Sequence, residues 1–230
     1  MARNRTPPLR TPRSLLVGAL TATSLVTPVF GLGSALSTGE SAPPGTLGPY
    51  SLTPFPFGYD DPRTGFVADV PSPLGGMLIF SSAMEILTVG SGWASWSHGF
   101  DGDVYAVDLA VLNPEGKYEV TLDLPVETGA FLFYAEPAVD GEFTITARLD
   151  DGTLLSQEVQ GTAGAKGFGF WASPGSSLAS ITVSSEFENV DFAIGEFSIA
   201  RAVVPEGGTV VVGGLMLGLL GVPVLRRLRR

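Results

Sequence analysis

The sequence contains no cysteine and a single histidine, His98. The absence of cysteine excludes disulfide bonds, thiolate metal sites, thiol nucleophiles and haem attached through a Cys-x-x-Cys-His motif. A single histidine also excludes a metal site built from several imidazole ligands. The fold must therefore be stabilised by its hydrophobic core, which a domain of well over 100 residues is large enough to bury.

Basic residues are scarce in the middle of the chain. Of the 13 lysines and arginines, four precede residue 38 and four follow residue 204, which leaves five bases against 22 acids between them. Residues 38–204 therefore carry a net charge of −17. Nucleic-acid binding depends on Lys and Arg side chains that neutralise phosphates, so we expect no nucleic-acid partner.

Residues 1–37 have the composition of a secretory signal peptide. Four arginines come first, a mostly apolar stretch covers residues 15–26, and small residues follow up to Ala35-Leu36-Ser37. This pattern predicts export, with cleavage after Ala35 or Ser37. The alternative is an uncleaved anchor, which Thr27-Pro28 and the following small residues disfavour because they end a helix early.

The end of the chain has three parts. Val204-Pro205-Glu206 comes first, the 17 residues from Thr209 to Leu225 carry no charge, and Arg226, Arg227, Arg229 and Arg230 follow. A membrane-spanning helix needs about 17 to 25 residues, so the apolar run is just long enough. Arginines that snorkel to the interface would hold this end in the cytoplasm. Residues 202–230 are thus predicted to be an anchor, whereas a buried helix would leave the four arginines without nearby acids.

Between the two ends the sequence predicts strands. Residues 38–75 hold eight prolines and are predicted to form an arm that is only partly ordered. Residues 76–201 have short runs of alternating apolar and polar residues, and no amphipathic helix pattern occurs. The predicted strands are 77–80, 84–89, 104–111, 118–124, 130–135, 142–149, 153–159, 167–171, 178–184 and 190–199. Such a series is typical of an all-β fold, an antiparallel β-sandwich or jelly roll.

The combination of a signal peptide, a β-rich body, Val204-Pro205-Glu206, an apolar span and terminal arginines resembles the PEP-CTERM sorting-domain proteins. Segments such as 96–105, 130–137, 161–170 and 190–197 are similar to segments of one β-sandwich group in that family, so the resemblance covers about residues 90–230. The family signature reads Pro-Glu-Pro, and Gly207 stands at its third position here. The resemblance implies that an exosortase, a membrane transpeptidase-like enzyme, reads the motif. It further implies a destination at the cell surface or in the exopolysaccharide matrix outside the cell.

Candidate catalytic residues are few. His98 lies beside Ser95 and Ser97, but no Gly-x-Ser-x-Gly motif is present, and neighbours in sequence do not by themselves form a nucleophile and base. We therefore interpret His98 as structural. Acid pairs such as Asp150 and Asp151 would suit a glycosidase only across a cleft, and most of them fall in predicted turns. We expect the protein not to be an enzyme, with a hydrolase as an alternative.

Two binding hypotheses remain open. Asp101-Gly102-Asp103 places two carboxylates on one loop, which suits Ca²⁺, although solvated turn acids are the alternative. Trp93, Trp96 and Tyr105 lie in a Gly- and Ser-rich segment and would stack on sugar rings if exposed, or fill the core if buried. The sequence thus predicts an envelope protein with a structural or adhesive role. The alternatives are a carbohydrate-binding module that takes polysaccharide, or a protein that is simply anchored in the membrane.

Overall fold

The computed structural model describes residues 33–56, 65–107, 119–186 and 190–203. The prediction of an all-β fold is confirmed, because the described residues form strands and one short 3₁₀ helix, η1 (Ser97–Gly99). No helix among them is long and apolar enough to cross a membrane. The predicted span from Thr209 to Leu225 and residues 1–32 of the predicted signal peptide lie outside the described residues.

The strands succeed one another along the whole of the described chain. Their bounds are β1 (Ser34–Gly39), β2 (Thr46–Leu47), β3 (Tyr50–Ser51), β4 (Thr53–Pro54), β5 (Gly65–Pro71), β6 (Met77–Val89), β7 (Gly92–Trp93), β8 (Asp103–Ala106), β9 (Glu119–Pro137), β10 (Glu142–Leu149), β11 (Leu154–Gln160), β12 (Lys166–Trp171), β13 (Leu178–Ser185) and β14 (Phe192–Arg201). Strand β10 has the predicted bounds, and β11, β12, β13 and β14 differ from prediction by one or two residues at one or both ends, as strand ends usually do.

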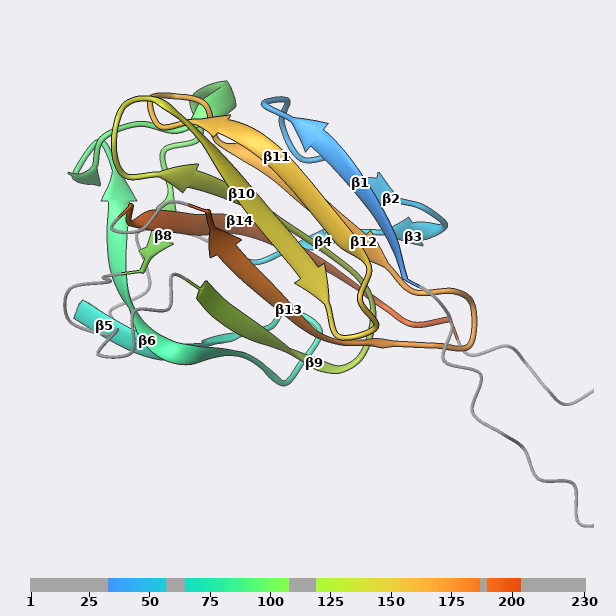
Figure 1. The fold of residues 1–230 in the computed structure, drawn as a ribbon. Helices are drawn as coiled ribbons and strands as arrows, with labels where there is room; N and C mark the ends of the chain where they lie inside the picture. Colours follow the sequence, from blue (N-terminus) through green and yellow to red (C-terminus); the bar gives the residue numbers. More distant parts are fainter. Residues whose placement is uncertain (1–32, 57–64, 108–118, 187–189, 204–230) are drawn as a thin grey trace, which may run out of the picture.

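The strands form two packed layers (Figure 1). The first layer has the order β11-β10-β13-β9-β6-β5, and the second has the order β1-β12-β9-β14-β8-β6. Strands β6 and β9 belong to both layers, because each bends and continues from one into the other. All pairings are antiparallel except the short one between β6 and β7.

The bends explain where the predicted strand boundaries were wrong. The sequence predicted separate strands at 77–80 and 84–89, and again at 118–124 and 130–135, but β6 and β9 are continuous. In β9 the bend falls at Glu127, whose φ of 63° is in the left-handed region. The polar residues at each bend resemble a turn in sequence, yet the chain continues forward and changes layer.

The main hydrophobic core fills the space between the two layers. Phenylalanines dominate the second layer's inner face, and aliphatic side chains such as Leu122, Ile145 and Ile181 face them from the first layer. Phe197 is fully buried and contacts four other rings at centroid distances of 5.5 to 6.4 Å. Alternation within each strand thus directs one face of each layer inwards, as the periodicity predicted.

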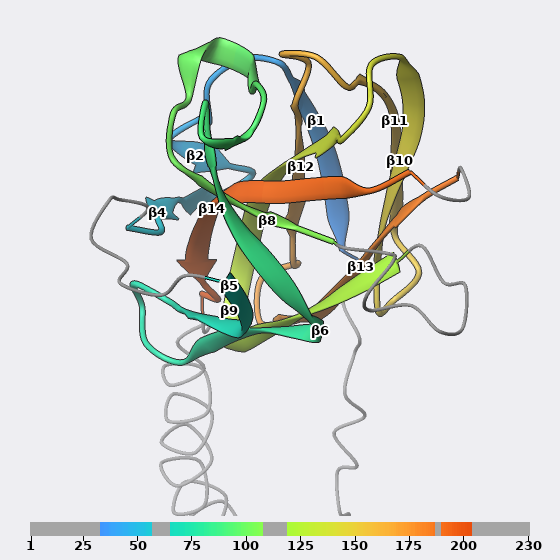
Figure 2. The ribbon, with the colours of Figure 1, turned by 90° about the vertical axis from the view of Figure 1, so that its left-hand side faces the viewer.

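A second core lies on the outer face of the second layer. Leu132 and Tyr134 of β9 and Ala193 of β14 point to this side, where Leu47 and Tyr50 of the N-terminal arm cover them. Strand β4 of the arm pairs with β14 and so extends the second layer (Figure 2). The described part of the arm is therefore packed against the sandwich, so both faces of the second layer are buried.

Strand β1 lies at the edge of the second layer and pairs with β12. It contains both residues after which the sequence predicted cleavage, Ala35 and Ser37. The registers also place Ser34, Trp171, Ala130 and Ala200 in one row across β1, β12, β9 and β14. The start of β1 and the end of β14 therefore lie at the same end of the sandwich, which we call the exit end.

Candidate functional site

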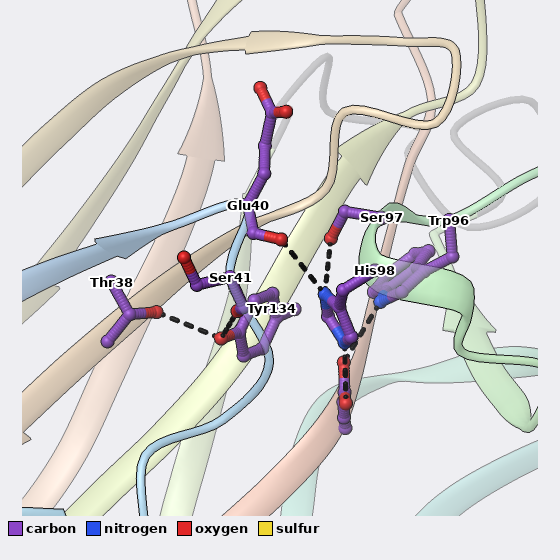
Figure 3. Close-up of polar contacts among 8 residues, drawn as sticks. Thr38, Glu40, Ser41, Trp96, Ser97, His98 and Tyr134 are labelled. Atoms are coloured by element: carbon purple, nitrogen blue, oxygen red, sulfur yellow. Dashed lines mark hydrogen bonds and ion pairs between the residues drawn. The ribbon is translucent and has the colours of Figure 1, made fainter.

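A group of residues joined by hydrogen bonds lies around His98, on the outer side of the second layer (Figure 3). Helix η1 comes after β7 and presents His98, whose φ of 44° is left-handed. Glu196 comes from β14, at a bulge where the register with β9 shifts, and its φ is 54°. His98 and Glu196 thus both have this rare backbone conformation, and their side chains contact each other. Such a conformation persists only where the surrounding structure holds it in place.

Both ring nitrogens of His98 are engaged. Nε2 lies 2.9 Å from Oε1 of Glu196, and Nδ1 lies 2.8 Å from the Ser97 hydroxyl and 3.2 Å from the carbonyl oxygen of Glu40. The other carboxylate oxygen of Glu196 accepts a hydrogen bond from the indole N–H of Trp96, at 3.2 Å. The His98 and Glu196 side chains are only 13% and 12% exposed.

Tyr134 of β9 completes this group, which we call the histidine cluster. Its ring meets the His98 ring edge to face at 5.1 Å, and its hydroxyl bonds Thr38 Oγ1 at 3.0 Å and donates to the Ser41 carbonyl. Burial raises the pKa of Tyr134 to about 12, so the hydroxyl stays protonated and able to donate. Burial also raises the pKa of Glu196, against the opposing effect of its hydrogen bond with His98.

The chemistry of the histidine cluster favours a structural role. Ser97, His98 and Glu196 form a chain of hydroxyl, imidazole and carboxylate, as in serine hydrolases. However, Ser97 is only 2% exposed, and a nucleophile has to reach its substrate. The contacts instead connect the arm at residues 38–41, helix η1 and the two strands β9 and β14. The cluster therefore fixes two segments onto the second layer: the arm, and the loop between β7 and β8 that contains η1 (residues 94–102), which we call the η1 loop.

A second buried carboxylate belongs to Glu136 of β9, which is fully buried. It accepts hydrogen bonds from the Trp93 indole N–H at 2.8 Å, the Gly164 backbone N–H at 3.1 Å and the Ser95 hydroxyl at 3.4 Å. Ser95 in turn accepts the N–H of Ala163 at 2.8 Å. Burial raises the pKa of Glu136 even though these donors favour the ionised form. Glu136 thus joins the β7–η1 loop to the turn before β12.

Sequence reasoning found His98 but missed Tyr134, Glu136 and Glu196. Each of these lies in a strand whose apolar pattern gives no sign of a buried polar partner. Their contacts with the η1 loop span 36 to 100 residues of sequence. Only the position of Glu136 and Tyr134 on the same face of β9, two residues apart, could have suggested a shared environment.

The aromatic residues proposed for glycan binding are buried. Trp93, Trp96 and Tyr105 are 8%, 5% and 3% exposed. Stacking on a sugar ring needs an open ring face, so the expected aromatic platform is corrected to core packing. Trp93 and Trp96 belong to the second core, and Tyr105 stacks on Phe197 in the main core.

The two candidate calcium ligands do not come together with a third. Asp103 accepts a hydrogen bond from the Thr88 hydroxyl at 2.7 Å, and Asp101 is exposed. Within residues 33–56, 65–107, 119–186 and 190–203, no three His, Asp or Glu side chains are grouped so that they could hold a metal ion. Asp101 and Asp103 are therefore not joined by a third carboxylate among the described residues.

At the exit end the chain is fixed as far as Val203. The Ala202 N–H donates to the Glu127 carbonyl at 2.7 Å, and the Gly175 N–H donates to the Val203 carbonyl at 3.2 Å. A cavity of about 280 Å³ lies beside this point, lined by Leu74, Val126 and Arg201 among others. The predicted motif Val204-Pro205-Glu206 and Arg226, Arg227, Arg229 and Arg230 lie outside the described residues.

Comparison with protein families and with curated proteins gives no match. No protein-family model matches the chain, and no curated protein shows significant similarity to it.

Replacing His98 with asparagine tests the structural role of the histidine cluster. Asparagine adopts the left-handed conformation readily, so this change removes the contacts to Glu196 and Glu40 without straining the turn. We expect the free energy of unfolding to fall by about 1 to 2 kcal/mol, as for the loss of two partly buried hydrogen bonds. Urea denaturation measures this, with S156A on the exposed side of β11 as the control. An unchanged midpoint would contradict the structural role.

Proposed function

We propose that the chain is an exported, non-enzymatic β-sandwich protein of the cell envelope, sorted by its C-terminal segment. In this proposal an exosortase reads Val204-Pro205-Glu206, and the body is displayed at the cell surface or in the exopolysaccharide matrix. The observation that carries the proposal is the position of the motif, which begins directly after Val203, whose carbonyl accepts a hydrogen bond from Gly175 of the sandwich.

The spacing of the parts supports sorting. Only five residues separate Val203 from Thr209, where the uncharged run begins. An extended chain spans at most about 3.3 to 3.6 Å per residue, so these five residues reach about 18 Å. The folded body would therefore stay close to the membrane until the chain is cut. Pro205 favours an extended conformation at Val204, which suits entry into a processing enzyme.

The body supports a role in display. The groups that would serve catalysis are occupied by internal contacts: His98 and Glu196 fix the arm, and Glu136 fixes the η1 loop. The carbohydrate-binding alternative loses its aromatic platform, because all three proposed rings are buried. A body with a net charge of −17 repels other acidic surfaces, which suits a protein that stays dispersed in a matrix.

The double change Pro205→Ala and Glu206→Ala tests the motif. We expect the fraction of cleaved protein to fall about tenfold in cells that express the exosortase, because the fixed proline and the charge are removed together. Quantitative immunoblotting with an antibody against the folded body, on surface-released and membrane fractions, measures this.

Gly207→Pro is the matched control, since it completes the Pro-Glu-Pro pattern of the family that the tail resembles. We expect cleavage of this variant to equal or exceed that of the unchanged protein. Cleavage that is insensitive to the double change would mean that the motif is not what the enzyme reads. A body that stays in the membrane fraction in all three cases would mean that the tail only anchors the protein.

A further inference from the structure

The first described residues of the chain are integral to the fold. Five positions of β1 are in register with β12, beginning with Ser34 opposite Trp171 and ending with Gly39 opposite Gly167. Cleavage after Ala35 would remove the first two of these positions. Cleavage after Ser37 would remove four of the five, leaving only Gly39. Either cut would open the edge of β12, whose paired residues include the buried rings of Phe168 and Phe170.

Side chains of β1 also close the gap between the two layers. Gln157 of β11, in the first layer, donates from Nε2 to the Gly167 carbonyl of β12, in the second layer, at 3.0 Å. Its Oε1 accepts a hydrogen bond from the Ser37 hydroxyl. Thr38 then connects β1 to Tyr134 in the histidine cluster. Loss of Ser37 would remove one of the contacts that hold the layers together at this side.

The contacts of the body extend one residue before β1. The Gly33 N–H donates to the Asp151 carboxylate at 2.5 Å, and its carbonyl accepts from Thr153 Oγ1 at 3.3 Å. The backbone of Gly33 also packs closely, because a Cβ at this position would lie 2.4 Å from Cδ1 of Leu149. The hydrogen bond from Gly33 contributes to the lowered pKa of Asp151, against the effect of burial. Gly33 therefore packs against the turn between β10 and β11 and forms hydrogen bonds with it.

We propose that the signal peptide is cut before β1, at the Gly31–Leu32 bond, so that the mature chain keeps Gly33 and the whole of β1. A peptidase of this kind reads the residues one and three positions before the bond and favours small ones, and Gly31 and Val29 stand at these positions. Gly33 supplies another small residue before Ser34, so the Gly33–Ser34 bond is the latest one that spares β1. The step is a hydrolysis in which water gives its hydroxyl to the Gly31 carbonyl carbon and a proton to the Leu32 nitrogen. The inference rests on the proposed export of the chain.

Terminal-peptide mass spectrometry of the full-length protein, expressed with its own N-terminus and recovered after export, tests this. The expected first residue is Leu32, whereas a start at Ser34 would lose the contacts of Gly33 and overturn the proposed bond. A start at Leu36 or Thr38, or an exported chain that still begins at Met1, would overturn it.

Two single changes place bulky residues at the competing sites. Gly31→Leu should lower cleavage at the Gly31–Leu32 bond about tenfold or move the start to Ser34, since leucine is poorly accepted next to the cut bond. Ser37→Leu should leave the start at Leu32. The opposite pattern, with Ser37→Leu alone blocking cleavage, would overturn the proposal.

Export is scored separately, by the access of an added protease to the body in intact spheroplasts. An accessible body that starts at Leu36 or Thr38 overturns the cleavage proposal and leaves the proposed function intact. A protected body that retains Met1 overturns both.

Discussion

Replacing Phe197 with alanine should lower the free energy of unfolding by about 4 kcal/mol, the middle of the range for removing a buried phenylalanine. Phe197 is fully buried in β14, the strand that pairs with β9 on one side and β8 on the other. Its ring stacks on Tyr105 with an interplanar angle of 17° and meets Phe55 edge to face at 5.7 Å. The cavity left behind would therefore reach the arm, β8 and both layers at once.

Urea denaturation followed by circular dichroism measures this loss. Phe66→Ala is the matched control, because Phe66 has the same side chain but is 49% exposed at the edge strand β5. Changes at exposed positions usually stay within about 0.5 to 1 kcal/mol. If the two variants lost similar stability, the main core would not be organised around Phe197.

Replacing Glu136 with alanine should lower the free energy of unfolding by about 3 kcal/mol at neutral pH. The change leaves the Trp93 indole N–H and the Gly164 N–H buried without an acceptor, and each such group costs about 1 to 3 kcal/mol. Trp93 also makes the effect visible, because its fluorescence should change when the loop detaches. Trp93→Phe keeps an aromatic ring but removes one donor, so its stability loss should be smaller, about 1 kcal/mol.

Glu136→Gln separates charge from packing through its dependence on pH. Burial raises the pKa of Glu136 in the folded state above the ordinary value of 4.5. At pH values between 4.5 and the raised pKa of the folded state, the folded protein binds more protons than the unfolded protein. The stability that Glu136 contributes therefore falls as the pH rises. Glutamine does not ionise. The stability of the unchanged protein minus that of Glu136→Gln should therefore decrease as pH rises through this window.

Thermal unfolding of the unchanged protein and of Glu136→Gln, at pH values from about 4 to about 8, measures this difference in stability. The lower limit lies near the ordinary pKa of a glutamate. Glu196→Gln is the second comparison, because burial raises the pKa of Glu196 in the same direction. A difference that is constant across this range, or that grows with pH, would contradict a buried carboxyl whose pKa is raised.

The fold class could be predicted from the sequence because its signal is local. Alternation of apolar and polar residues in 143–149 and the turn at 150–153 define a hairpin without any distant information. The bends in β6 and β9 could not be predicted, since a strand that changes layer has the same local pattern as two strands separated by a turn. The role of β1 was also hidden, because its small residues are typical of a cleavage region as well as of an edge strand.

The candidate site was predictable only at His98. Its partner Glu196 is held by a bulge in β14, and a bulge depends on pairing with a neighbouring strand. Glu136 and Tyr134 alternate with buried apolar residues in β9, so the sequence places them on one face but not beneath a loop. Trp93 and Trp96 are buried in the second core together with Leu47 and Tyr50 of the arm, and the proline-rich sequence of the arm did not indicate that core.

The intact mass of the protein released from the cell surface tests the central proposal most directly. In cells that contain the exosortase, we expect a mature chain that ends near Val204-Pro205-Glu206 and lacks the residues from Thr209 to Arg230. In cells without the enzyme, the full C-terminal segment should remain and the body should stay with the membrane. A released or membrane-bound chain that keeps Thr209 to Arg230 whenever the exosortase is present would contradict sorting.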